Sequence, residues 1–237
     1  MTSRTPTIGI IGGFGADTSA TFCVRLVEHA HRLKPSHPPA FVVDFVSVPP
    51  ALSGKAIRGS REAAAMLVEA INRSIVRLHS AGVQAVAFPC NTMHIFADAF
   101  VLPQQVQLLH IVDTVLHELR SRGITRVGML ATQLTVSSRL YEDRLAAAGV
   151  HCVAPSALLQ QQLSEAIGSF VETGKVSPGP AEALHCCFDE FRRQGVSAVV
   201  FGCTDVSSML QRCEFAAPIP CIDSMNVLAK ACARLCV

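Results

Sequence analysis

The sequence has 237 residues, of which half are apolar and 16% are charged, and its formal net charge is +2. This length allows one large domain or two lobes of ordinary size, and the apolar content is enough to bury a core. The small net charge excludes the strongly basic surface that binding to nucleic acid or to an anionic membrane requires.

No apolar run approaches the roughly 20 residues of a membrane span. The first residues lead directly into a strand pattern and lack the apolar core of a signal peptide. We therefore expect a cytoplasmic protein without a membrane anchor.

The first half of the chain alternates strand and helix patterns. Short β-branched runs predict buried parallel strands, and apolar residues at helical spacing predict helices. A helix capped by Asp17 or Thr18 is expected to run to about Leu33. The Pro-, Gly- and Ser-containing segment 49–60 is predicted to be a loop with a lid role. The remaining predicted elements are strands at 7–11, 40–48, before Cys90 and at 108–112, and helices at 61–80 and 94–100.

The pattern restarts in the second half. Residues 126–130 match the first strand, with Gly128 in the place of Gly9. The elements expected after it are strands at 151–154, 198–201 and 220–222, and helices at 140–148, 160–173 and 180–194.

A strand, a turn with a cysteine and a helix start occur twice. The first copy reads AGVQAVAFPC and ends at Cys90; the second reads QGVSAVVFGC and ends at Cys203, 113 residues later. Six of the ten aligned positions are identical. Each cysteine is therefore expected at the carboxyl end of a strand and the amino end of a helix, where open α/β sheets bind ligands.

Two further landmarks repeat in the same order. Gly9 corresponds to Gly128 at an offset of 119, and Asp113 corresponds to Asp223 at an offset of 110. We interpret the chain as two similar flavodoxin-like or Rossmann-like α/β lobes related by duplication, each with a mainly parallel sheet. We expect lobe 1 to comprise residues 1–108 and 216–237, lobe 2 to comprise residues 109–215, and the active site to lie between them.

The paired cysteines indicate acid/base chemistry. A helix amino terminus and a dry cleft bring the pKa of a thiol into the working range. Asn91, Thr92 and Thr204 lie beside the same turns and are suited to a substrate carboxylate and to the enolate oxygens formed from it. Asp205 is a candidate for binding an ammonium group.

His94 follows Cys90 by four residues, so it could share the helical face of the cysteine and help to ionise it. The alternative is a helix-end histidine bonded to a backbone carbonyl.

The glycine-rich turn after the first strand does not favour a nucleotide. Gly9, Gly12, Gly13 and Gly15 lack the G-x-G-x-x-G spacing. Gly13 and Phe14 are instead expected to bring the backbone close to a small ligand. None of the four lysines lies at an apolar strand end, which argues against pyridoxal phosphate, and no residues have metal-ligand spacing. We expect no cofactor and no metal.

These motifs resemble the aspartate/glutamate racemase family of cofactor-independent amino-acid racemases. The resemblance covers nearly the whole chain through IGIIGG (8–13), CNTMH (90–94) and FGCTD (201–205). It implies two α/β lobes, commonly in a homodimer, and an amino-acid substrate. It also implies that Cys90 and Cys203 are the two acid/base residues and that Asn91, Thr92 and Thr204 bind the substrate carboxylate.

The sequence departs from the family at the side-chain carboxylate. Aspartate-specific members carry an arginine in a Pro-Asp-Arg-Thr stretch, where this chain has PPAL (49–52), and a lysine where it has Glu172, two residues before Gly174. Arg58, Arg61 or Lys175 could replace these cations. A broad-specificity or non-acidic amino-acid racemase fits at least as well as an aspartate racemase.

Two other functions stay open. A maleate-isomerase or arylmalonate-decarboxylase type of enzyme uses cysteine as a nucleophile or a proton donor and does not always need both thiols. A non-catalytic ligand-binding protein could keep the two lobes, although the presence of both cysteines favours the racemase.

Overall fold

The structure is a computed structural model that describes residues 6–173, 179–212 and 215–237. The chain forms two compact units, the first of residues 1–114 and 225–237 and the second of residues 115–224. Each unit contains one four-stranded sheet, and every strand pairing within the two sheets is parallel. Within the described residues, no helix is both long and apolar enough to cross a membrane.

The sheet of the first unit has the strand order β2-β1-β3-β4. Its strands are β1 (Ile8–Gly12), β2 (Phe41–Phe45), β3 (Ala85–Ala87) and β4 (Gln107–Leu109). β1 and β3 are buried throughout, because they have a hydrogen-bonded neighbour on each side and helices over the sheet. This order matches the first four strands of the flavodoxin-like arrangement.

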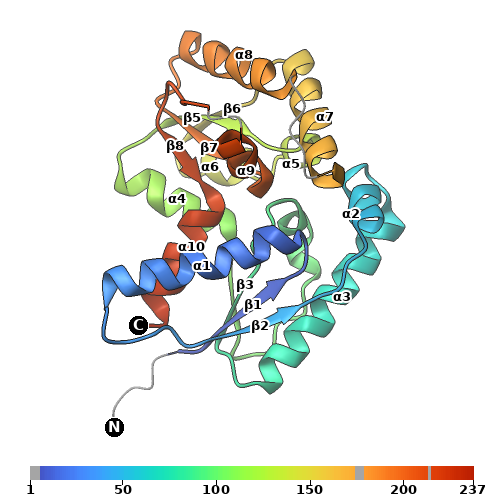
Figure 1. The fold of residues 1–237 in the computed structure, drawn as a ribbon, viewed down its shortest axis with the longest axis vertical. Coiled ribbons are helices and arrows are strands. Elements are labelled where there is room, and N and C mark those ends of the chain that lie inside the picture. The colour runs from blue at the N-terminus through green and yellow to red at the C-terminus, as the bar shows by residue number, and fades with distance from the viewer. Residues whose placement is uncertain (1–5, 174–178, 213–214) are drawn as a thin grey trace. The chain divides into compact units, whose positions relative to one another are not determined.

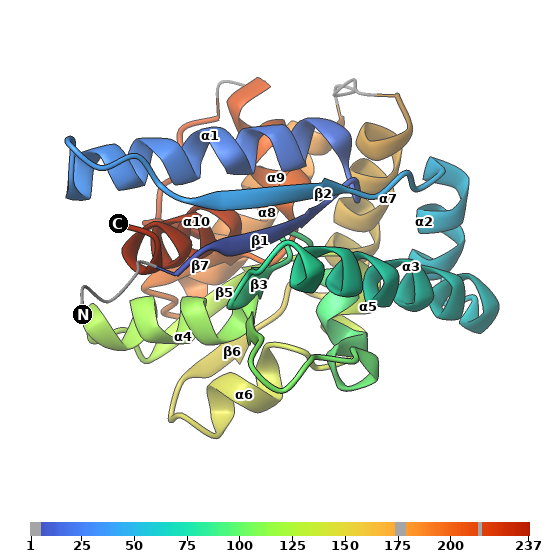
Figure 2. The ribbon, with the colours of Figure 1, turned by 90° about the horizontal axis from the view of Figure 1, so that it is seen from below.

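Helices cover both faces of this sheet. Figure 2 shows α1 and α3 on opposite sides of β1 and β2. The long helix α3 buries Leu67, Ile71, Ile75 and Leu78 at helical spacing, and these side chains pack in one core cluster with strand residues such as Ile11 and Val86. The helices of this unit are α1 (Ala16–Leu33), α2 (Pro50–Ile57), α3 (Arg61–Ser80), the 3₁₀ helix η1 (Thr92–Ala99) and α10 (Ser224–Leu235), while α4 (Ile111–Ser121) begins in this unit and continues in the second unit after Thr114.

The second unit repeats this architecture with the order β6-β5-β7-β8 (Figure 1). Its core packs strand residues of β5, β6 and β7 against α7, α8 and α9. The strands are β5 (Arg126–Leu130), β6 (His151–Val153), β7 (Ala198–Phe201) and β8 (Cys221–Asp223). The helices are α5 (Gln133–Ser137), α6 (Glu142–Ala146), α7 (Ala157–Thr173), α8 (Gly179–Arg193) and α9 (Thr204–Arg212).

The duplication extends to the register of the strands. Gly9 lies opposite Val86 in the first sheet, and Gly128 lies opposite Val199 in the second. The ends of α3 and α8, the two cysteines and the starts of α4 and α10 all differ by the same 113 residues (193−80, 203−90 and 224−111). The predicted correspondence between Asp113 and Asp223 is therefore wrong. Asp223 ends strand β8, and the residue 113 positions before it is His110.

The limits of the units lie a few residues from the expected ones. We expected boundaries after residues 108 and 215, whereas the chain passes to the second unit after Thr114 and returns after Ser224. Residues 109–114 complete β4 and the first turn of α4. β8 pairs with β7 and so belongs to the second sheet.

Several elements differ from the sequence prediction, and three of them lie near the first cysteine motif or the glycine-rich turn. The expected loop at 49–60 contains helix α2, which begins with Pro50 at its first position, where proline is well tolerated. The expected strand at 108–112 ends at Leu109, and α4 begins at Ile111. Helix α1 begins one residue before Asp17, after Gly15; Ser19 accepts a hydrogen bond from the Gly13 N–H and donates one to the Gly15 carbonyl.

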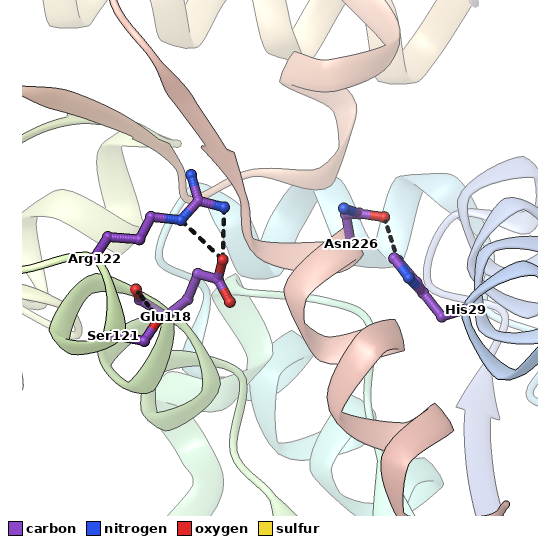
Figure 3. Close-up of polar contacts among 5 residues, drawn as sticks. All are labelled: His29, Glu118, Ser121, Arg122 and Asn226. Carbon is purple, nitrogen blue, oxygen red and sulfur yellow. Dashed lines mark hydrogen bonds and ion pairs between the residues drawn. The ribbon is translucent and has the colours of Figure 1, made fainter. Parts of the chain in front are cut away.

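Polar side chains also join and stabilise individual helices (Figure 3). In the first unit, His29 of α1 and Asn226 of α10 lie 2.9 Å apart (Nε2 to Oδ1). At the end of α4, Ser121 donates to the Glu118 carbonyl, and Arg122, the residue after the helix, donates from Nε to Glu118 Oε1 at 2.9 Å. The Glu118 side chain is nearly buried, so its pairing with Arg122 offsets the cost of removing the carboxylate from water.

The turn after β1 generates a prediction about Gly13. A Cβ atom there would lie 1.8 Å from the Val46 carbonyl oxygen, and the residue has φ +99°. Gly13→Ala should therefore abolish folding or lower the free energy of unfolding by more than about 4 kcal/mol. Gly59→Ala is the matched control, since Gly59 has φ +94° with nothing within 4 Å. It should cost only the roughly 1–2 kcal/mol of left-handed backbone. Equal losses for the two variants in urea unfolding would contradict the close approach.

Candidate active site

Each sheet has one topological switch point, which lies between its two central strands. In the order 2-1-3-4 the connections after β1 and β3 leave in opposite directions, and open α/β sheets bind ligands at the carboxyl ends of such strands. In the first unit Gly13 and Phe14 follow β1, and Cys90 follows β3. The Phe14 and Phe88 rings meet edge to face at 4.7 Å, so the two turns lie side by side.

The structure explains Gly13 without a ligand. The space that a side chain at this position would occupy is filled by the backbone of Val46, which follows β2. The Val46 N–H also donates to the Gly12 carbonyl at 3.0 Å. The close backbone approach that the structure shows at this turn is to the protein's own chain, and the predicted approach to a small ligand stays a prediction.

The Cys90 turn presents a half-buried thiol followed by buried polar residues. Its N–H donates to the Phe88 carbonyl at 2.8 Å. Asn91 and Thr92 are buried and open the 3₁₀ helix η1. The turn therefore concentrates hydroxyl, amide and backbone N–H groups next to the thiol at a helix start, an arrangement that suits an anion.

His94 contacts the backbone of the same turn. Its Nδ1 lies 2.8 Å from the Cys90 carbonyl oxygen, and its Nε2 accepts the Ile111 N–H at 3.3 Å. The side chain is buried, at 2% exposure. These contacts match the carbonyl-bonded histidine that the sequence left as an alternative.

The second unit repeats the turn with a different polar neighbour. Cys203 follows β7, is buried, and precedes α9, whose first residue is the buried Thr204. The Cys203 thiol donates to a carboxylate oxygen of Asp205 at 3.8 Å. A hydrogen-bonded carboxylate favours the protonated form of the thiol.

Tyr141 lies beneath this turn and has no sequence motif around it. A Cβ at Gly202 would lie 3.4 Å from the Tyr141 ring, which is an ordinary contact distance, and 2.6 Å from Met129 Sδ, so Met129 is the neighbour that requires a glycine before Cys203. Burial is the main cause that raises the pKa of Tyr141 well above its usual value, and a hydrogen bond with Ser224 lowers it in part. The phenol therefore stays neutral, and only the structure reveals its position.

Comparison with known proteins identifies the family. The model of the Asp/Glu/hydantoin racemases matches residues 11–232, nearly the whole chain. The chain belongs to the Asp/Glu/hydantoin racemase family.

Relatives of this family member span its full length. The broad specificity amino-acid racemase RacX of Bacillus subtilis is 24% identical over 229 residues, which are 94% of this chain and 95% of RacX. The crystal structure of a candidate Asp/Glu racemase from Yersinia pestis is 25% identical, with a TM-score of 0.77, and the match covers 97% and 98% of the two chains. The aspartate racemase of Picrophilus torridus is 24% identical, with a TM-score of 0.76 over 97% and 93%.

The region where aspartate-specific family members carry an arginine contains no cation at that position here. Ala51 is exposed at the start of α2, and Leu52 packs against the core. Arg58 and Arg61 are exposed near the end of α2 and the start of α3. Lys175 and Gly174 lie outside the described residues, as does the side chain of Glu172. Among the residues described, no three His, Cys, Asp or Glu side chains are grouped to hold a metal ion.

The hydrogen bond between Cys203 and Asp205 makes the reactivity of the Cys203 thiol depend on the Asp205 carboxylate. Asp205→Asn removes the negative charge that favours the protonated thiol, so alkylation of Cys203 by iodoacetamide at pH 7 should accelerate roughly three- to tenfold. Peptide mass spectrometry separates the two sites, and Cys90 in the same sample is the internal control. An unchanged rate at Cys203, or equal acceleration at both cysteines, would contradict the assignment.

Proposed function

We propose that this protein interconverts the enantiomers of an amino acid by proton transfer at Cα, with Cys90 and Cys203 as the acid/base pair. The observation that carries the proposal is the equivalence of the two cysteines: each follows the third strand of its sheet, at the switch point, and precedes a helical segment. The family to which the chain belongs supports an isomerase of this type.

In the proposed reaction, one cysteine as thiolate removes the Cα proton and becomes a thiol. The electron pair left on Cα is delocalised into the substrate carboxylate as an enolate, which Asn91, Thr92 and Thr204 stabilise. The other cysteine as thiol gives a proton to the opposite face of Cα and becomes a thiolate. No electrons are gained or lost, so the protein's own acid/base groups are sufficient.

The different neighbours of the thiols supply the required asymmetry. A two-base racemase needs one thiolate and one thiol at the start of each turnover. Asp205 favours the protonated form of Cys203 through the 3.8 Å hydrogen bond. Cys90 is followed by the neutral residues Asn91 and Thr92. In the free enzyme Cys90 therefore carries the thiolate more readily, and Asp205 retains oxygen lone pairs with which to bind the substrate ammonium group.

We further propose a broad or non-acidic substrate range. Ala51 and Leu52 occupy the stretch where aspartate-specific members carry an arginine, and Leu52 contributes to the core. A substrate carboxylate buried without a charged partner is strongly disfavoured. The match to RacX, named as a broad specificity amino-acid racemase, supports the same conclusion. A homodimer stays a prediction of the family resemblance, and a cytoplasmic location stays a prediction of the sequence.

One experiment separates the proposed racemase from both alternatives, a maleate-isomerase or arylmalonate-decarboxylase type of enzyme and a non-catalytic binding protein. Each of the common L-amino acids is incubated with the protein in deuterated water and followed by proton NMR. A racemase exchanges the Cα proton and forms the other enantiomer. A binding protein shows neither change, and the alternative enzyme types act on dicarboxylic acids and leave the Cα proton in place.

The mechanism predicts that Cys90→Ser and Cys203→Ser each lower the racemisation rate by 10²–10⁴-fold, as is typical when an acid/base group is lost. The double variant should be little worse than either single variant, since the two thiols act as a unit. Cys186→Ser, at an exposed cysteine in α8, is the control and should keep the parental rate.

The isotope pattern tests the same mechanism independently. Starting from one enantiomer in deuterated water, early deuterium should appear mainly in the product, because the second thiol has already exchanged with solvent. Equal early labelling of substrate and product, or a single variant that racemises near the parental rate, would refute the two-thiol mechanism.

The substrate proposal predicts that kcat/KM for aspartate does not exceed that of the best neutral amino acid by a hundredfold. Arg58→Gln and Arg61→Gln should leave kcat/KM for that neutral substrate unchanged, because neither residue is needed to bind it. A hundredfold preference for aspartate that one of these variants abolishes would show that an arginine has replaced the family's cation.

A further inference from the structure

The first turn of α4 is capped by two imidazole rings. The first four N–H groups of a helix have no partner within the helix, so each must find one elsewhere. Ile111 donates to His94 Nε2 at 3.3 Å, and Val112 donates to His110 Nδ1 at 3.3 Å. The next two N–H groups, of Asp113 and Thr114, both donate to the His110 carbonyl, at 3.1 and 3.2 Å. All four groups are satisfied, two of them by histidine side chains.

These contacts determine the tautomer of each ring. A carbonyl oxygen only accepts hydrogen bonds, so His94 must donate from Nδ1 to the Cys90 carbonyl and accept from Ile111 at an unprotonated Nε2. His110 accepts at Nδ1, so its proton is on Nε2. The two rings meet edge to face with centroids 4.6 Å apart. The two rings in contact are therefore both neutral, with the proton on Nδ1 in His94 and on Nε2 in His110.

The second unit has a contact between the equivalent positions. The offset of 113 relates His94 to Ser207 and His110 to Asp223, and Ser207 donates to an Asp223 carboxylate oxygen at 2.8 Å. Asp223 directly precedes α10, as His110 precedes α4. Serine and aspartate are common at helix amino termini, whereas histidine is unusual there. Both units thus have a side-chain contact between these two positions, and the contact is made by imidazoles only in the unit that contains Cys90.

We propose that His94 and His110 are positioning residues for Cys90: the two neutral imidazoles hold the Cys90 turn against the first turn of α4. His94 acts through the Cys90 carbonyl, and His110 acts through its ring contact with His94 and its cap on α4. Neither residue exchanges a proton with the substrate. The effect on catalysis rests on the proposed racemase activity, whereas the tautomers and the hydrogen bonds do not.

The tautomers are measured by ¹⁵N NMR on the full chain labelled at histidine, at pH 7.5. Protonated and unprotonated ring nitrogens differ strongly in chemical shift, and His94→Asn and His110→Asn assign the two residues among the nine histidines. His94 should be protonated at Nδ1 and His110 at Nε2. The same tautomer on both rings, or a charged ring on either, would overturn the proposal.

Two substitutions separate the two hydrogen bonds of His94. The side-chain amide of asparagine lies where Nδ1 does, so His94→Asn keeps the bond to Cys90 and loses the acceptor for Ile111. The amide of glutamine lies where Nε2 does, so His94→Gln does the reverse. Hydrogen exchange of the Ile111 amide should accelerate at least about tenfold in His94→Asn and stay near parental in His94→Gln.

If His94 positions Cys90, kcat should rank the two variants in the opposite way to amide exchange, with His94→Gln more impaired than His94→Asn. His94→Gln should lower kcat at least about tenfold with little change in KM, because it misplaces the reacting thiol, and His94→Asn should recover most of that loss. His110→Ala should lower kcat and His110→Asn should rescue it, since asparagine is a strong N-cap. His117→Asn, at an exposed histidine of the same helix, is the control and should match the parent.

The opposed results for asparagine and glutamine distinguish positioning from stability alone. If kcat falls in parallel with amide protection in both variants, His94 is only a structural brace and the proposal is wrong. If His94→Asn and His94→Gln are equally inactive while the Ile111 amide behaves as expected, His94 acts as a proton-transfer group and the proposal is again wrong. If the parent itself does not exchange the Cα proton, the proposed function fails, and the tautomer and amide measurements still test the contacts.

Discussion

Every residue of the central strands β3 and β7 is buried, so neither strand can carry a reactive side chain along its length. Each is hydrogen-bonded on both sides and buried on both faces, so polar or reactive side chains are excluded from the strand itself. They collect at the first position where the chain leaves the sheet, which is the carboxyl end. Cys90 and Cys203 lie at these ends, and the polar residues that follow them open the next helical segment. The position of the thiols thus follows from the burial of the strands.

Duplication of this arrangement provides two thiols, and divergence around them provides the asymmetry that the proposed proton transfer uses. Two identical sites would give neither cysteine a preference for carrying the thiolate. Here the position two residues after the cysteine is Thr92 in one unit and Asp205 in the other. The position four residues after it carries an imidazole in the first unit and a hydroxyl in the second. The two units therefore repeat the same backbone arrangement but differ in the polar and charged side chains that follow each cysteine.

The sequence was sufficient for the strands, the two cysteine turns and the duplicated α/β architecture, because β-branched runs and the repeated motif are local signals. It failed where a tertiary contact decides the local structure. Ile111 and Val112 look like the continuation of a strand, whereas in the structure they begin a helix, and the Ile111 N–H is capped by the imidazole of His94, 17 residues earlier in the chain. Tyr141 has no motif around it, and its position beneath Gly202 depends on packing across the sheet.

The glycine-rich turn after β1 is likewise explained by a tertiary contact within the protein. Its glycine is required by the Val46 carbonyl of the neighbouring strand connection, so its residue type is no evidence for a ligand. In the proposed function, substrate recognition in the first unit then depends on Asn91, Thr92 and the backbone N–H groups of the Cys90 turn. An arrangement of this kind binds the carboxylate that every amino acid carries and makes no demand on the side chain. Within this unit, the proposed broad substrate range therefore follows from recognition of the carboxylate that all amino acids share.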